Sequence, residues 1–365
     1  EELFGFEESV KSVYENFEIV EFPDHVDLKS KVNNKVYNAG NFQIRSSDRS
    51  TYDLHKKDRK GTLNIIKGNG QRSKHFELVD ILTMQSLPKW NGATYLAASN
   101  FNCLEFVSSY QSAKDGVTNY YADVTQGPYA ALACGPAIVY RNYFYKHDDV
   151  IGQIDKDVDL LCKTPIIVKR GYAQIKDDTD FKKMKNESGK TINLSEYDWS
   201  NPQIWQVGVH RNCEVVMTRG LGRTFSTVPP NQIAHHVYAA AFNFFGDVVE
   251  TKFTQKITQD LLKAEYRATI LAAWENSQLY PDLPGSNKLS LTLLGGGVFN
   301  NPYDLICDAI STNVDLIEES GLDVYVTCFN QDTFNEVKDY LLVDVESTNG
   351  KVYDTNDDES CKDLI

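Results

Sequence analysis

Residues 288–302 read KLSLTLLGGGVFNNP, and this segment decides the fold that the sequence predicts. The apolar run 289–294 is short and bounded by turn-forming residues, which is typical of a strand buried on both faces of a parallel sheet. The three glycines let the backbone turn and approach a ligand closely. Asn301 suits a helix N-cap and Pro302 the first helical position, so a helix should follow. Its free N–H groups would point back at the glycines, where an anion can bind.

A second candidate anion-facing helix start lies at Gln126, Gly127 and Pro128, before an Ala-rich run. Two such N-termini in one chain could grip a diphosphate. Packing alone is an equally good explanation of each turn. The glycines 295–297 would allow tight strand–helix contact, and Gly127–Pro128 would be an ordinary junction into a core helix. The sequence leaves both alternatives open.

The composition is that of a globular protein in a reducing compartment. The chain has 365 residues, 41% of them hydrophobic and 24% charged, which suffices for one large domain or two. The seven cysteines are widely spaced and form no Cys-x-x-Cys pair, which favours reduced thiols and a cytoplasmic location. No stretch approaches the roughly 18 apolar residues of a membrane helix, so no membrane span is predicted. The start at Glu1 leaves open a leader removed before it.

The net charge restricts the partners that we expect. A formal charge of -14 and a pI of about 5.0 oppose direct binding to nucleic-acid phosphates, which needs a basic face. A phosphate-bearing ligand would therefore be held by backbone N–H groups and helix ends. The 20 tyrosines and 18 phenylalanines make an aromatic surface a candidate contact for a protein partner.

Strands that alternate with helices predict an α/β fold with three layers around a mixed sheet. We expect an N-terminal extension packed on the main domain (1–75), a main domain (76–345) with a charged insertion at about 147–203, and a flexible acidic tail (346–365). The insertion is interpreted as solvated, with a lid or a partner surface as the alternative. The expected strands are 42–45, 63–66, 76–84, 93–99, 166–168, 205–216, 289–294 and 322–330, and the expected helices are 129–140, 233–245, 257–274 and 303–319.

Four blocks follow one another along the main domain: Val79–Leu82, Tyr95–Asn100, Leu294–Pro302 and Val324–Phe329. In this order they resemble macrodomains, which bind ADP-ribose. The resemblance spans about residues 76–340, apart from the insertion, and is to a divergent branch of macrodomain-like proteins. It implies a macrodomain-like fold and ADP-ribose or a related nucleotide as the ligand.

The resemblance also implies roles for single residues. Asp80 would accept a hydrogen bond from the adenine amino group, and Asn100 would lie at the distal ribose. The backbone N–H groups of Gly295–Phe299 would hold the diphosphate. Phe329 or Asn330 would lie by the adenine, where an aromatic face can stack.

The chain departs from the family pattern after Asn100. Typical ADP-ribose hydrolases place a glycine-rich turn there, whereas here Phe101–Glu105 intervenes and Gln126–Pro128 must serve instead. This departure weakens the prediction of hydrolysis more than that of binding. The candidate ligand-binding residues are Asp80, Asn100, Asn102, Gln126, Gly127, Gly295, Gly296, Gly297, Val298, Phe299, Asn300, Phe329 and Asn330.

The candidate catalytic residues are Asn100, Glu105 and Asp123. Glu105 follows a strand end and could act as a general acid or base if burial raised its pKa, but an ion pair with Arg141 is the preferred alternative. Asn100 and Asn102 could position water or ribose hydroxyls, or close a turn.

Cysteine and metal chemistry are disfavoured. Thiol catalysis would need Cys103 beside His210 or His235, and nothing in the sequence fixes that distance. His235 and His236 are adjacent and would point apart in a helix, which is a poor metal pair, so no metal site and no required cofactor are predicted. Three functions remain open: an ADP-ribose-binding module, an ADP-ribosyl hydrolase, and a non-catalytic assembly subunit that retains the fold without a working pocket.

Overall fold

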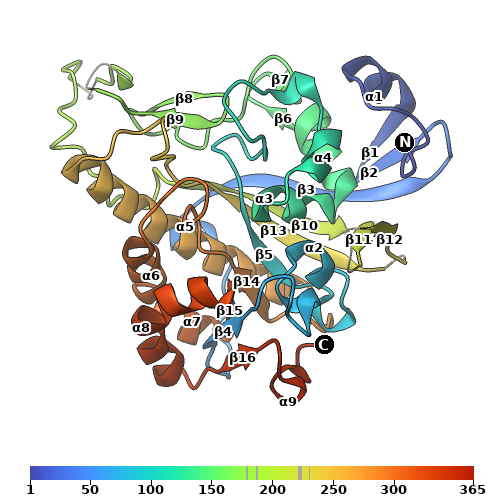
Figure 1. Ribbon diagram of the computed structural model, residues 1–365. Helices are drawn as coiled ribbons and strands as arrows, with labels where there is room; N and C mark the ends of the chain where they lie inside the picture. The colour runs from blue at the N-terminus through green and yellow to red at the C-terminus, as the bar shows by residue number, and fades with distance from the viewer. Residues whose placement is uncertain (178–179, 186–187, 221–223, 230) are drawn as a thin grey trace.

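The computed structural model describes residues 1–177, 180–185, 188–220, 224–229 and 231–365 (Figure 1). These residues build a ten-stranded mixed sheet in the order β1-β2-β3-β10-β13-β5-β14-β15-β4-β16. The strands are β1 (Phe17–Glu21), β2 (Val26–Ser30), β3 (Val36–Ser46), β4 (Thr62–Lys67), β5 (Thr94–Ala98), β10 (Gln206–Glu214), β13 (Ile233–Ala239), β14 (Lys288–Leu291), β15 (Asp323–Cys328) and β16 (Val352–Asp354). Neighbours pair antiparallel from β1 to β13 and parallel from β13 to β16.

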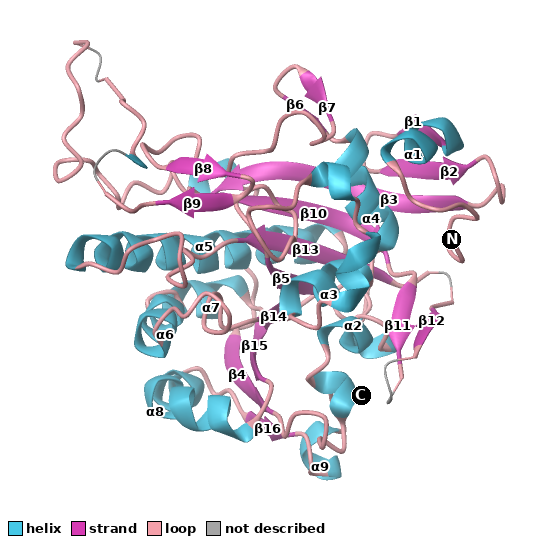
Figure 2. Ribbon diagram, turned by 45° about the horizontal axis from the view of Figure 1, so that its top comes forward, coloured by secondary structure: helices cyan, strands magenta, loops and turns pink. Residues whose placement is uncertain are grey.

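Helices cover both faces of the sheet, so the predicted α/β three-layer class is confirmed (Figures 1 and 2). One face carries α5 (Lys252–Leu279), α6 (Tyr303–Ser311), α7 (Val314–Ser320) and α8 (Gln331–Ser347), and the other carries α2 (Ile81–Met84), α3 (Gln126–Leu132) and α4 (Gly135–Val139). Successive side chains of a strand point to opposite faces, so Leu96 enters the core under α5 whereas Ala97 enters the core under α3 and α4. Among the described residues, no helix has the length and apolar content needed to cross a membrane.

The longest helix, α5, is stabilised by a cap at its N-terminus and by the burial of its apolar residues. Thr251 caps it in a reciprocal box with Thr254, which satisfies N–H groups that a helix start leaves free. Apolar residues at helical spacing, such as Leu261, Ile270 and Trp274, are buried against the sheet and α6. The helix predicted over 257–274 is therefore confirmed and extends further at both ends.

The first 75 residues contribute to the sheet itself, in contrast to the predicted extension. β3 pairs with β10, and β4 lies between β15 and β16. Leu63 and Ile65 of β4 are fully buried in the core under α5. β1 and β2 form the end of the sheet beyond β3, and the short α1 (Val10–Asn16) precedes β1.

The prediction of a buried helix over 233–245 is wrong. Residues 233–239 form β13, which pairs with β10 on one side and β5 on the other. A short apolar run without polar alternation fits a strand buried on both faces as well as a buried helix, so periodicity alone does not separate them. The β-branched and aromatic Ile233, Val237 and Tyr238 favour the strand.

Two further elements differ from prediction near the candidate site. Residues 76–84 form the 3₁₀ turn η2 (Phe76–Leu78) and α2 rather than a strand, with Asp80 at the N-cap position of α2. The helix expected over 303–319 is broken after Ser311 into α6 and α7, and Asn313 forms the junction.

The C-terminal tail is ordered, so the prediction of a flexible segment over 346–365 is wrong. β16 pairs with β4, and α9 (Asp358–Cys361) follows it. The indole Nε1–H of Trp90 donates to the Leu364 carbonyl at 2.9 Å, and Leu364 is 1% exposed. Long-range pairing with β4, which local composition does not reveal, fixes the tail.

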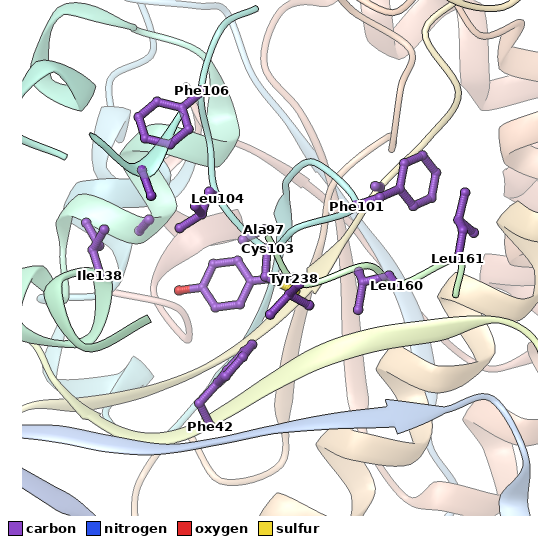
Figure 3. Close-up of a cluster of buried hydrophobic side chains, with 14 of the residues drawn as sticks. Phe42, Ala97, Phe101, Cys103, Leu104, Phe106, Ile138, Leu160, Leu161 and Tyr238 are labelled. Atoms are coloured by element: carbon purple, nitrogen blue, oxygen red, sulfur yellow. The ribbon is translucent and has the colours of Figure 1, made fainter. Parts of the chain in front are cut away.

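The insertion 147–203 packs on the domain, although residues 178–179 and 186–187 lie outside the described part. Leu160 and Leu161 are buried in the same core cluster as Phe101 and Leu104 (Figure 3). Phe181 and Trp199 belong to that cluster as well. The insertion is therefore partly a core element and not simply solvated. Within the insertion, β8 (Ile167–Lys169) and β9 (Tyr172–Gln174) form a hairpin.

The remaining short elements of the described chain are η1 (Arg49–Thr51), η3 (Pro88–Trp90), η4 (Ala113–Asp115), η5 (Thr118–Ala122), η6 (Tyr140–Phe144), β6 (Lys146–His147), β7 (Val150–Ile151), β11 (Met217–Arg219) and β12 (Phe225–Thr227).

Candidate functional site

The two glycine turns that the sequence singles out face one cavity of about 530 Å³. The turn after β14 contributes Gly295–Gly297, and the start of α3 contributes Gly127. β5 and β14 are adjacent and parallel, so the segments that follow them leave the sheet at the same edge. The tertiary structure thus brings together two turns that lie far apart in the chain, at Gly127 and at Gly295–Gly297.

The glycine turn after β14 presents free backbone donors. Gly295 has φ of 79°, in the left-handed region that favours glycine, and a Cβ on Gly296 would lie 2.6 Å from the Tyr303 ring. A Cβ on Gly297 would meet no atom within 4 Å. Within the described chain, the N–H groups of Gly297, Val298 and Phe299 donate to no protein acceptor. Packing requires the first two glycines, whereas Gly297 faces open space.

The start of α3 is fixed to the end of β5. The Gln126 amide accepts from the Ala98 N–H at 2.8 Å and donates to the Leu96 carbonyl at 2.7 Å. A Cβ on Gly127 would lie 1.7 Å from the Ala98 carbonyl oxygen, so close packing alone demands glycine there. Asp123 accepts from the Thr125 N–H at 2.9 Å and lines the cavity. The packing and ligand-facing explanations of this turn therefore hold together.

A second chamber of about 330 Å³ adjoins the first and includes Asp80, Phe76 and Tyr129 in its wall. The residues that line both chambers are Thr125, Gln126, Thr292, Thr327 and Phe329. The two chambers share these walls and form one groove along the carboxyl ends of the parallel strands.

Asp80 lies in the wall of the second chamber and is already paired. Arg219 donates to its two carboxylate oxygens at 2.6 and 2.9 Å, and the Thr83 hydroxyl donates to one of them. The guanidinium carbon of Arg219 lies 4.3 Å from the centroid of the Tyr129 ring. Each carboxylate oxygen can accept more than one hydrogen bond, so Asp80 keeps acceptor capacity beside this ion pair.

Glu105 lies behind the wall of the main cavity. Glu105 is among the residues that line the cavity, but its side chain is 0% exposed. The carboxyl accepts from Arg141 at 3.2 Å and from the Ser99 hydroxyl at 3.1 Å. Burial raises the pKa of Glu105 to about 7, although Arg141 and these hydrogen bonds act in the opposite direction. The predicted ion pair with Arg141 is present.

Asn100 and Tyr172 meet at one carbonyl on the cavity wall. The Asn100 amide and the Tyr172 hydroxyl both donate to the Phe106 carbonyl, at 2.8 and 2.7 Å. The Tyr172 ring lies 5.9 Å from that of Phe299, so the insertion closes the cavity against the glycine turn. Burial raises the pKa of Tyr172, which keeps the hydroxyl protonated as a donor.

Three predicted residues do not line either chamber. The Asn102 carbonyl oxygen accepts from the Leu104 N–H at 3.1 Å, and its amide donates to Asp157. Asn300 sits in the left-handed region with φ of 56° and closes the turn. Asn330 accepts from the Thr333 N–H at 2.9 Å as the N-cap of α8. Turn closure and capping explain these asparagines.

The sequence interpretation missed Tyr172, Arg219 and the threonines Thr125, Thr292 and Thr327. Tyr172 and Arg219 come from segments that carry no local signal for a site. Thr292 directly follows β14 and Thr327 lies one residue before the end of β15, where ligand groups of α/β sheets lie. The predicted strands 289–294 and 322–330 run past both threonines, so the rule did not single them out. The Thr327 hydroxyl has no hydrogen-bond partner among the described residues and lines both chambers.

The cysteine and histidine candidates lie away from the cavity in the described structure. Cys103 is fully buried, burial raises its pKa, and it does not line the cavity. His235 and His236 lie in β13, where His236 contacts Gln85 at 2.6 Å. No group of three or more His, Cys, Asp or Glu side chains in the described ranges could hold a metal ion.

No protein-family model and no curated protein matches the sequence. Several solved structures are similar, among them poly(ADP-ribose) glycohydrolases. The Deinococcus radiodurans enzyme in complex with ADP-ribose has 9% identity and a TM-score of 0.41, over 83% of this chain and 95% of that one. The Thermomonospora curvata enzyme has 9% identity and a TM-score of 0.41, over 92% and 96%. The apo D. radiodurans enzyme matches at 12% identity and a TM-score of 0.28, over 38% of this chain and 55% of that one. These values support no conclusion about the ligand of this chain.

Proposed function

We propose that the groove binds ADP-ribose or a related nucleotide diphosphate. The observation that carries the proposal is the convergence of Gly127 and Gly295–Gly297 on one open cavity, with the N–H groups of Gly297–Phe299 unpaired among the described residues. Backbone donors of this kind suit a diphosphate in a protein whose net charge of -14 would repel one elsewhere. The resemblance of the sequence to macrodomains implies the same ligand class.

The two joined chambers divide such a ligand into a base end and a sugar end. The second chamber offers Phe76, Tyr129 and Phe329 to a nucleobase, together with Asp80. The main cavity offers Asn100 and Asp123 to the distal ribose. The diphosphate would cross between them, beside the glycine turn.

Titration calorimetry with ADP-ribose tests this proposal. We expect the wild type to release or absorb heat and to bind at a single site. The Gly297→Trp variant should bind at least tenfold more weakly, because its side chain would enter the open space beside the free N–H groups, where no atom now lies within 4 Å. Val343→Phe, at a position 71% exposed on α8, is the matched control and should bind like the wild type. If the wild type shows no heat of binding and no thermal shift with ADP-ribose, nucleotide binding is refuted.

Hydrolysis of an ADP-ribosyl bond is the second candidate activity. Asp123 supplies a carboxylate on the cavity surface, which could take a proton from a water that attacks the anomeric carbon as the bond to the leaving group breaks. Solvent protonates the leaving group and the proton on Asp123 returns to solvent, so the elements of one water end on the two products. ADP-ribosylated protein is incubated with wild type, Asp123→Asn and Glu105→Gln. Unchanged substrate with intact binding would eliminate hydrolysis.

A purely structural role is the remaining alternative. An assembly subunit without a working pocket would be expected to fill the space beside Gly295 with its own side chains, whereas this space is an open cavity. The exposed aromatic residues Tyr110, Tyr121 and Phe245 remain candidate contacts for a protein partner. Absence of any nucleotide binding would support this structural role.

A further inference from the structure

Arg141 is a fully buried cation outside the ligand-binding surface. It lies in η6, and its side chain is 0% exposed. The guanidinium carbon lies 3.7 Å from the centroid of the Tyr238 ring. A buried cation is costly unless it is paired and hydrogen-bonded, so its partners identify its role.

Arg141 holds the loop Asn100–Phe106 at two points. Its Nε donates to the Cys103 carbonyl at 3.1 Å, and its Nη2 contacts both Glu105 oxygens at 3.4 and 3.2 Å. Cys103 has φ of 58°, which a residue other than glycine rarely adopts unless its surroundings hold it there. This loop carries Asn100, and the Phe106 carbonyl receives both Asn100 and Tyr172.

A relay of neutral groups fixes the other side of the guanidinium. Nη1 donates to the Tyr238 hydroxyl at 2.6 Å, and that hydroxyl contacts Nδ1 of His236 at 2.8 Å. Nε2 of His236 donates to the side-chain oxygen Oε1 of Gln85 at 2.6 Å. Oε1 is the acceptor because the side-chain Nε2 of Gln85 donates to two backbone carbonyls. Each proton therefore points away from Arg141, and one tautomer satisfies the whole relay.

His210 completes the set of neutral partners. Its Nε2 donates to the Ala39 carbonyl at 2.7 Å, which leaves Nδ1 as an acceptor 3.4 Å from Arg141. Burial lowers the pKa of His236 to about 3 and that of His210 well below its ordinary value, so both rings are uncharged at neutral pH. Among the described contacts of Arg141, Glu105 is the group that can ionise to a negative charge, and burial opposes that ionisation by raising its pKa to about 7. The titratable groups that face Glu105 are Arg141 from η6, Tyr120 from η5, Tyr238 from β13 and Cys103 from its own loop.

We propose that Arg141 is a positioning residue that holds Asn100–Phe106 as one rigid wall of the cavity, with the Glu105 carboxyl as its buried hydrogen-bond acceptor and not a proton donor to the ligand. The inference rests on the proposed function in so far as this wall presents Asn100 to a ligand. The cavity is then shaped from behind, by an ion pair that the ligand does not touch.

Hydrogen exchange of the ligand-free protein tests this inference. Arg141→Met should lower the protection of amides in 100–106 at least tenfold while α5 stays protected, and Arg141→Lys should restore part of it. After correction for intrinsic exchange rates, protection of this loop in the wild type should fall as pH rises from about 4.5 to 7. The reason is that the closed loop holds the Glu105 proton more tightly than an open loop does. In Arg141→Met the pH range over which loop protection falls should extend to higher pH, because the cation that favours ionised Glu105 is gone. In Arg141→Lys this pH range should stay near that of the wild type.

The isosteric Glu105→Gln variant keeps the test decisive if Arg141→Met does not fold. Its loop protection should be independent of pH. Protection in 100–106 that is unchanged in folded Arg141→Met, or that follows the wild-type pH dependence in Glu105→Gln, would overturn the inference. ADP-ribose affinity is measured separately with the same variants and should fall in Arg141→Met. Loss of loop protection in a protein that never binds ADP-ribose would refute the proposed function and leave the positioning role standing.

Discussion

Replacing Glu105 by Gln should remove a specific pH dependence of the free energy of unfolding. The pKa of Glu105 is raised by burial from 4.5 to about 7 in the folded protein, so between these values the folded chain keeps a proton that the unfolded chain releases. The unfolding free energy of the wild type therefore falls as pH rises through this window, by about 1.4 kcal/mol per pH unit and about 3 kcal/mol in all. Glutamine does not titrate, and it resembles the protonated carboxyl in size and hydrogen bonding.

Urea unfolding of the wild type and Glu105→Gln from pH 4.5 to pH 8 measures this effect. The difference between the two proteins cancels the other titrating groups, because they are common to both. We expect the variant to gain about 3 kcal/mol relative to the wild type across the window, with the difference levelling off about one pH unit above the folded pKa of about 7. A difference that is flat with pH, or that moves in favour of the wild type as pH rises, would refute the assignment of burial as the dominant influence on Glu105.

Three further predictions concern other parts of the groove and the fold. Arg219→Met should lower the free energy of unfolding by about 3–5 kcal/mol in urea, because it leaves the buried Asp80 carboxylate without its cation; adding Asp80→Asn should recover much of the loss, and no recovery would contradict the pairing argument. Tyr172→Phe should weaken ADP-ribose binding about fivefold in calorimetry through one lost hydrogen bond of about 1 kcal/mol, and equal affinity would show that this bond does not shape the cavity. Deleting 352–365 should lower the thermal midpoint, because β16 and the acceptor for Trp90 are lost, and an unchanged midpoint would contradict an ordered tail.

The elements that the sequence predicted well have a strong local pattern. The strand before Gly295, the strand before Asn100 and the long helix α5 are present, because an apolar run of fixed length or a helical period of apolar residues is set within a few residues. The elements it predicted wrongly depend on distant partners. Residues 233–239 become a strand because β10 and β5 lie on either side, and the C-terminal residues are ordered because β4 offers them an edge.

The candidate site shows the same division. The glycine turns could be located from local sequence, since residue type and the preceding strand predict where the backbone turns. The assembled fold was needed to see that Gly127 and Gly297 share a cavity, that Tyr172 lines it, and that Glu105 points toward Arg141. The physical reason is that backbone geometry is a local property, whereas burial, charge pairing and the shape of a cavity depend on segments that meet only when the sheet is assembled.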